Sequence, residues 1–201
     1  VIEGSPPTAA TVSSSYEFWP KASDADGDAV SFTVANKPAW AAFDPATGRN
    51  KVMPMPEAIG SFALRELGGF IVALRGGIWL ARADGALDRK VFAPPYDPAT
   101  HRFNDGRCDH RGRFFVGSMN ERRDAPSATL VRVDLDGTMT EALAGMTISN
   151  GLAWSPDGRT MYHADTPTRV VRAYDYDVAS GTPWNPRTLA QWTAETDRPD
   201  G

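Results

Sequence analysis

The sequence predicts an all-β protein built from repeated units of short strands. Gly68, Gly112 and Gly158 recur at intervals of 44 and 46 residues, and a strand-like run with apolar residues follows each of them. An alternating segment and a second turn come next, which is the pattern of β-propeller blades. No long stretch has apolar residues at helical spacing, and glycine and proline interrupt the chain throughout. We expect about three blades in residues 51–201, which is part of a propeller.

The composition indicates a chain that can bury a core. It has 201 residues, of which 41% are apolar and 23% charged. A net charge of −4 gives no electrostatic reason to expect nucleic acid or an anionic membrane as a partner. No apolar run approaches the roughly 18 residues of a membrane helix. The start of the chain has neither the basic residues nor the apolar core of a signal peptide, although a leader that was cleaved off stays open. A single cysteine, Cys108, excludes an internal disulfide and a thiolate zinc cage.

Residues 1–50 differ in character from the rest of the chain. Apolar residues 30, 32 and 34 alternate with polar ones, which predicts a strand with one buried face, and turn-forming residues flank it. This pattern is typical of a small β-sandwich. The carboxylates of Asp24, Asp26 and Asp28 offer hard oxygen ligands for a second calcium site. The alternative is a solvated hairpin turn, because aspartate and glycine favour turns without any metal.

This first segment resembles the cadherin-like or Ig-like modules of bacterial surface and secreted proteins. The resemblance is carried by Ser23-Asp24-Ala25-Asp26-Gly27-Asp28, Asn36-Lys37-Pro38-Ala39-Trp40 and Thr47-Gly48-Arg49. The closing strand of that family is replaced here by a Met- and Pro-containing run, so we expect a partial module. The resemblance favours an extracellular or periplasmic location and leaves a cytoplasmic one open.

Three short polar motifs that end in glycine recur along the second segment. They are Arg102-Phe103-Asn104-Asp105-Gly106, Ser149-Asn150-Gly151 and Arg198-Pro199-Asp200-Gly201. The innermost strand of each propeller blade lines the central channel, so groups at the starts of these strands should converge on one axis. Oxygens of the second and third motifs suit Ca²⁺, Mg²⁺, Mn²⁺ or Zn²⁺. Each motif alone is also a common turn sequence, which is the structural alternative.

In this order and spacing, the motifs resemble the SMP-30/gluconolactonase/regucalcin family from about residue 56 to residue 201. Two further runs carry the resemblance, Leu152-Ala153-Trp154-Ser155-Pro156-Asp157-Gly158 and Ala173-Tyr174-Asp175-Tyr176-Asp177. The resemblance implies a six-bladed β-propeller that hydrolyses small sugar lactones with one divalent metal ion on its axis. The fold class we predict is therefore a partial six-bladed-type propeller, preceded by a short Ig-like β segment.

The resemblance also assigns roles to individual residues. It implies that Asn150 and Asp200 bind the metal, which is Ca²⁺ or Zn²⁺, with Mg²⁺ and Mn²⁺ as alternatives. Asp200 would also be the catalytic general base toward a water molecule. Arg102 and Asn104 match positions that bind the substrate, and a guanidinium can hold sugar hydroxyls or a ring oxygen.

One family feature is missing from the sequence. The third protein ligand of the family is a glutamate in an early Gly-Glu-Gly-Pro-like motif, whereas Glu57 and Glu66 stand in other contexts. We therefore expect weakened metal binding and impaired lactonase activity in this chain. The alternative function is that of a non-catalytic extracellular calcium-binding or adhesion module. A thiol nucleophile formed by Cys108 with His101 or His110 is a further possibility, against which stands a cysteine that is simply buried.

Overall fold

The computed structural model describes residues 53–194 and 197–200 in full, and among the first 52 residues it describes four short strands. The contacts divide the chain into two units, Val1–Pro54 and Met55–Gly201. In the first unit, two antiparallel pairs form, β1 with β2 and β3 with β4. The Ig-like character of residues 1–50 and the calcium site at Asp24, Asp26 and Asp28 lie outside the described residues and stay predictions. The four strands are β1 (Ile2–Glu3), β2 (Lys21–Ala22), β3 (Ala42–Phe43) and β4 (Asn50–Lys51).

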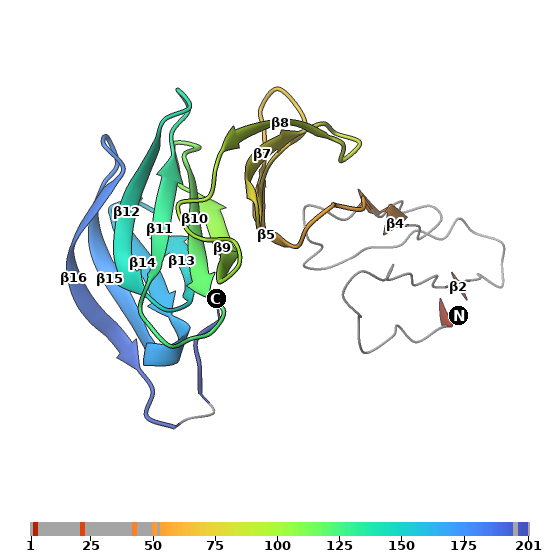
Figure 1. Ribbon diagram of the computed structural model, residues 1–201. Coiled ribbons are helices and arrows are strands. Elements are labelled where there is room, and N and C mark those ends of the chain that lie inside the picture. Colours follow the sequence, from red (N-terminus) through yellow and green to blue (C-terminus); the bar gives the residue numbers. More distant parts are fainter. Residues whose placement is uncertain are drawn as a thin grey trace. The chain divides into compact units, whose positions relative to one another are not determined.

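The second unit consists of three four-stranded antiparallel sheets, in which each strand pairs with the next one along the chain (Figure 1). We call them blades 1, 2 and 3. Apart from one 3-10 turn, η1 (Thr166–Thr168), the described residues contain no helix, and none therefore is long and apolar enough to cross a membrane. The all-β class and the blade-like repeat are confirmed. The strands are β5 (Ile59–Leu64), β6 (Phe70–Leu74), β7 (Gly77–Ala81) and β8 (Leu87–Phe92) in blade 1; β9 (His101–Cys108), β10 (Phe114–Asn120), β11 (Ala128–Val133) and β12 (Met139–Met146) in blade 2; and β13 (Ser149–Trp154), β14 (Thr160–Asp165), β15 (Val170–Asp177) and β16 (Thr182–Gln191) in blade 3.

The recurring glycines mark the first hairpin turn of each blade. Gly68, Gly112 and Gly158 have φ of +87°, +79° and +72°, in the left-handed region that favours glycine. Each donates its amide hydrogen to the carbonyl three residues earlier, which closes a β-turn. The 44- and 46-residue intervals in the sequence therefore measure the length of one blade.

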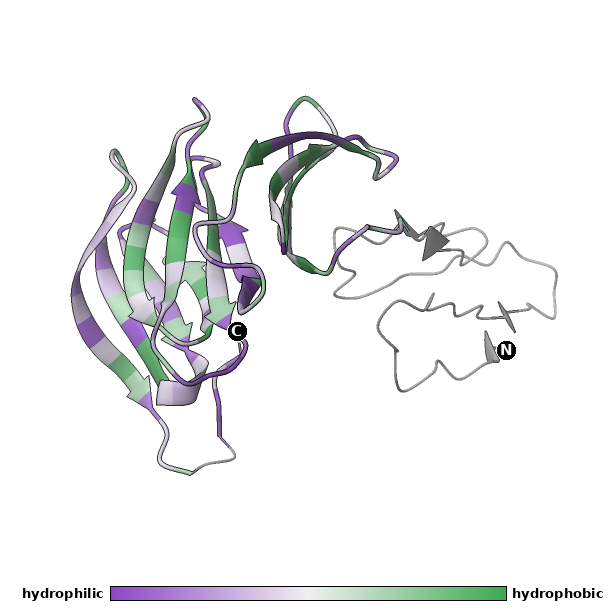
Figure 2. Cartoon of the chain, viewed as in Figure 1, coloured by the Kyte–Doolittle hydropathy of each residue, from purple (hydrophilic) through white to green (hydrophobic). Residues whose placement is uncertain are grey.

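The core lies between successive blades. All seven residues of β10 are buried, because its two faces pack against different neighbours. Phe114 and Val116 pack in one cluster with Ile78 of blade 1, while Phe115 packs in another with Met161 of blade 3. Figure 2 shows apolar residues along the central strands, whereas the outer strand β8 has a hydrophilic middle flanked by apolar residues. Burial on both faces explains why β10 reads as a nearly continuous apolar run rather than an alternating one.

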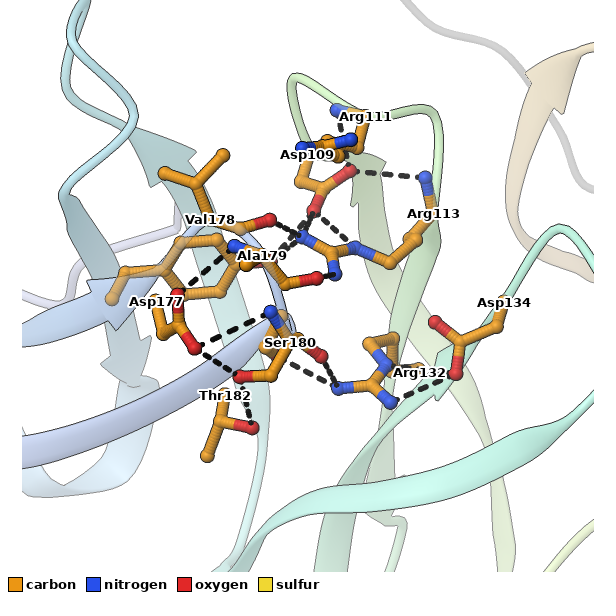
Figure 3. A network of polar contacts seen from close by, with 12 residues as sticks. Asp109, Arg111, Arg113, Arg132, Asp134, Asp177, Val178, Ala179, Ser180 and Thr182 are labelled. Carbon is orange, nitrogen blue, oxygen red and sulfur yellow. Dashed lines mark hydrogen bonds and ion pairs between the residues drawn. The ribbon is translucent and has the colours of Figure 1, made fainter.

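The inner strands β5, β9 and β13 lie side by side. Their first residues mark one end of the second unit, and their last residues mark the other end. Ser61 Oγ donates a hydrogen bond to Gly106 O at 2.9 Å, which ties β5 to β9. At the end where β9 finishes, a polar network around Asp109 and Arg113 joins blade 2 to the β15–β16 turn (Figure 3). The starts of β9 and β13, which carry the predicted site residues, lie together at the opposite end.

Candidate functional site

Three side chains predicted to converge do meet at the start of the inner strands. The Asn104 amide donates from Nδ2 to Asn150 Oδ1 at 2.9 Å and to Ser149 O at 3.0 Å. The Asn150 amide donates in turn from Nδ2 to Asp200 Oδ1 at 2.7 Å. Asn150 is buried, Asn104 is half-buried and Asp200 is exposed, so the group opens toward solvent. We call Asn104, Asn150 and Asp200 the axial cluster.

Two neighbouring residues hold the segments that carry this cluster. Asp165, only 3% exposed, accepts hydrogen bonds at Oδ1 from the amides of Thr147 and Ile148, which fixes the chain as it enters β13. Thr166 Oγ1 accepts from Asn150 Nδ2 at 2.9 Å and donates to the carbonyl of Pro199 at 2.8 Å. The segment bearing Asp200 has no strand of its own and is held against blade 3 by this hydroxyl.

A buried hydrogen bond lies directly beneath the cluster. Ser149 Oγ and His163 Nε2 are 2.8 Å apart, and both residues are buried. Burial, assisted by the positive charge of Arg172, lowers the pKa of His163 to about 4, so its imidazole is neutral at pH 7. Gly117 of β10 leaves no room for a side chain at this point, because a Cβ there would collide with Ser149. Neither His163 nor its hydrogen bond to Ser149 stood out from the sequence.

Arg102 connects the axial cluster to a pair of charged residues. Its Nη1 donates to Asn104 Oδ1 at 3.1 Å, and its Nε lies 3.5 Å from Glu121 Oε1. Both carboxylate oxygens of Glu121 accept from Arg75, each at 2.8 Å. Glu121 and Arg75 were missed by the sequence analysis. The one available signal was the same for both: each is a charged residue directly after the second strand of its blade, Arg75 after β6 and Glu121 after β10.

The other candidate residues lie apart from the cluster. Glu57 accepts a hydrogen bond from the amide of Gly76 at 2.6 Å, and Glu66 is exposed in the β5–β6 turn. Cys108 and His101 occupy opposite ends of β9, and in the described part of the chain no hydrogen bond joins Cys108 to a histidine. Burial raises the pKa of the Cys108 thiol. A protonated thiol without a base is a poor nucleophile, which favours the structural reading of this cysteine.

The donor set of the axial cluster fits a hard divalent cation in kind. It offers one carboxylate and two amide oxygens, and each amide oxygen accepts one hydrogen bond and keeps a second lone pair. Within the described ranges, no group of three or more His, Cys, Asp or Glu side chains is arranged so that it could hold a metal ion. The guanidinium of Arg102 next to Asn104 Oδ1 disfavours a cation there, and the substrate-binding roles of Arg102 and Asn104 stay predictions. The ligand roles of Asn150 and Asp200 stay predictions.

Comparison with known proteins identifies the family. A model of the SMP-30/Gluconolactonase/LRE-like region matches residues 22–201. The chain belongs to this family. Within the SMP-30/gluconolactonase family, the chain is 41% identical over 159 residues to 6-deoxy-6-sulfogluconolactonase from Pseudomonas putida, covering 79% of the chain and 54% of that protein. It is 30% identical over 164 residues to Regucalcin from Xenopus laevis, covering 79% and 55%. The chain thus spans about half the length of the curated relatives it matches.

Solved structures share the fold of this chain. A calcium-binding regucalcin from Agrobacterium tumefaciens aligns with a TM-score of 0.68 at 25% identity, over 74% of this chain and 50% of that one. A luciferin-regenerating enzyme aligns with a TM-score of 0.67 at 25% identity, over 75% and 53%. A gluconolactonase from Xanthomonas campestris shares the fold, with a TM-score of 0.52 at 20% identity over 67% and 49%.

Proposed function

We propose that this SMP-30/gluconolactonase family member hydrolyses sugar lactones at the axial cluster. One observation carries the proposal: three polar side chains, 46 and 50 residues apart in sequence, form a continuous hydrogen-bonded group that is open to water at Asp200. The name of the Pseudomonas putida relative, a 6-deoxy-6-sulfogluconolactonase, supports a sugar lactone as the substrate class and adds a sulfonated lactone to those worth testing.

Each residue has a role that its contacts support. Arg102 is placed to donate to ring or hydroxyl oxygens of the sugar, whereas both N–H groups of Asn104 are already used and its Oδ1 can accept from a sugar hydroxyl. Asn150 and Asp200 would hold a divalent cation, which when bound supplies a positive charge that polarises the lactone carbonyl. Asp200 takes the proton from the attacking water, since it is the exposed carboxylate of the group and Asn150 orients its Oδ1.

A second candidate is calcium binding without hydrolysis. The solved relative with a TM-score of 0.68 is titled a calcium-binding protein, and the all-oxygen donor set suits Ca²⁺. The two functions differ in what Asp200 does. In a lactonase it binds the cation and also accepts a proton, whereas in a binding protein it binds the cation alone.

The test is a lactone-hydrolysis assay on matched aspartate variants. Acid release from glucono-1,5-lactone and from its 6-sulfo analogue is followed with and without EDTA. We expect Asp200→Asn to lower kcat/KM about 100-fold or more, because a general base is lost. Asp136→Asn is the control, since Asp136 also precedes a glycine but lies in an exposed turn. Turnover that EDTA and Asp200→Asn leave unchanged would refute the proposal.

Calorimetric titration separates catalysis from binding. Because the family glutamate is missing, we expect this chain to bind Ca²⁺ and Zn²⁺ with low affinity. Tight binding at one site would contradict that expectation. Tight binding without turnover above the spontaneous rate would favour the calcium-binding alternative.

A further inference from the structure

Arg75 is half-buried, and its guanidinium makes a large set of contacts. Its guanidinium binds both oxygens of Glu121, each at 2.8 Å, and donates to the carbonyls of Pro98 and His101 at 3.0 and 3.3 Å. Tyr96 donates its hydroxyl to the Arg75 carbonyl at 3.3 Å. Arg75 follows β6 in blade 1, whereas Glu121 follows β10 in blade 2. The side chain is therefore a fixed link between two blades.

The position of the turn that bears Arg75 is also fixed. Glu57 accepts from the amide of Gly76 at 2.6 Å, and its negative charge faces Arg75. The backbone of Arg75 is fixed by this turn, and its guanidinium is fixed by the backbone carbonyls it binds. Such a side chain loses little further conformational entropy when it binds a carboxylate. Arg75 can thus determine where Glu121 points.

Two guanidinium groups share the single carboxylate of Glu121. Arg75 takes both oxygens at 2.8 Å, so Arg102 is left with a longer contact of 3.5 Å from its Nε. Arg102 consequently keeps its Nη1 on Asn104 Oδ1, at 3.1 Å. Without Arg75, the carboxylate would be free to pair closely with Arg102 and draw it away from Asn104.

We propose that Arg75 is a positioning residue of the lactone site, which holds Glu121 beside Arg102 and so keeps Arg102 directed at the axial cluster. The inference rests on the proposed function. Its chemical consequence concerns the substrate: a fixed carboxylate beside a fixed guanidinium can accept from one sugar hydroxyl and donate to another. The site would then select lactones that carry free hydroxyl groups on the ring.

The electrostatics of Glu121 agree with this role. The hydrogen bond from Arg75 lowers the pKa of Glu121, and the charges of Arg75, Arg102 and His101 act in the same direction. Glu121 is thereby an acceptor over a wide pH range. Removing Arg75 should raise the pKa of Glu121, so the rise of KM at acid pH should begin at a higher pH in the variant.

The experiment compares Arg75→Gln with Arg132→Gln in the full chain. Arg132 is a matched control because it also binds a carboxylate, Asp134, and the carbonyls of Ser180 and Gly181, but at the opposite end of the blades. We expect Arg75→Gln to raise KM about tenfold or more with kcat changed less than about threefold. Arg132→Gln should change neither, although both variants lower the melting temperature.

A double variant shows whether Arg75 acts through Glu121. If it does, adding Arg75→Gln to Glu121→Gln raises KM no further, because the coupled groups are not additive. Additive effects, or a KM in Arg75→Gln equal to that of Arg132→Gln, would overturn the inference.

A binding measurement separates this inference from the proposed function. The dissociation constant of gluconate, measured by calorimetry, should be about tenfold higher in Arg75→Gln than in the unchanged protein. Gluconate binding without lactone turnover would refute the proposed hydrolysis while still testing Arg75. Equal binding by both proteins, or no binding by the unchanged protein, would refute the positioning role itself.

Discussion

Replacing Arg113 by methionine should remove a buried ion pair of blade 2 together with the hydrogen bonds that join it to blade 3. The Arg113 guanidinium lies 2.6 Å from Asp109 Oδ2, and the two side chains are 8% and 1% exposed. It also donates to the carbonyls of Val178 and Ala179 at 2.7 and 3.1 Å, which holds the β15–β16 turn (Figure 3). Methionine keeps most of the apolar stem and removes the charge, so the variant isolates the polar contribution.

The expected cost follows from what is left behind. Removing one partner of a buried ion pair typically costs 3–5 kcal/mol, because the other charge stays buried without compensation. Asp109 would retain the Tyr176 hydroxyl at 2.6 Å and two backbone amides at Oδ1. Burial acts to raise the pKa of Asp109, but the hydrogen bonds from Tyr176 and Arg113 outweigh it and hold the pKa below its usual range. With these remaining donors, we expect a loss of about 3 kcal/mol.

The assay is unfolding by guanidinium chloride at pH 7, followed by tryptophan fluorescence. The control is Arg187→Met, because Arg187 pairs with Asp175 at 2.6 Å but the two side chains are 48% and 35% exposed. An exposed pair of this kind contributes less than about 1 kcal/mol. The reasoning is refuted if Arg113→Met shifts the unfolding midpoint no more than Arg187→Met does, at an unchanged m-value.

Two further predictions concern the layer beneath the axial cluster. In the folded protein the pKa of His163 is lowered to about 4, whereas an unfolded histidine has a pKa of about 6.5. The unfolded state therefore binds a proton first on acidification, and the free energy of unfolding decreases by about 3 kcal/mol between about pH 6.5 and pH 4. His163→Gln should flatten this pH dependence of the unfolding free energy, and an equally steep profile would contradict the assignment. Gly117→Ala should cost about 1–3 kcal/mol, because the added methyl group collides with Ser149. Ser149→Gly in the same chain should recover part of that loss in denaturant unfolding, and no recovery would exclude this collision as the cause.

The general architecture was readable because it is repetitive. Gly68, Gly112 and Gly158 each adopt a left-handed backbone in the first hairpin of their own blade. One local requirement for glycine therefore recurs once per blade. The convergence of Asn104 and Asn150 followed from the same logic, since each is placed near the start of an inner strand and inner strands share an end. When units repeat, residues at equivalent positions of neighbouring units lie close together, so a local sequence pattern predicts a contact between distant residues.

Contacts that occur once in the molecule could not be predicted in this way. Arg75 and Glu121 directly follow the equivalent strands β6 and β10 of blades 1 and 2, but the repeat does not indicate that these two side chains bind each other. Nothing in the local sequence around Ser149 or His163 indicates that the two side chains form a hydrogen bond. They meet because β13 pairs with β14 and because Gly117 leaves space for Ser149.

The sequence by itself determined the strand class, the length of the repeating unit and the chemical types of the residues near the axis. These depend on turn conformation and alternation, which act over a few residues. The tertiary structure alone decided which carboxylate each guanidinium binds and which polar groups are buried, because side-chain partners depend on how neighbouring sheets pack.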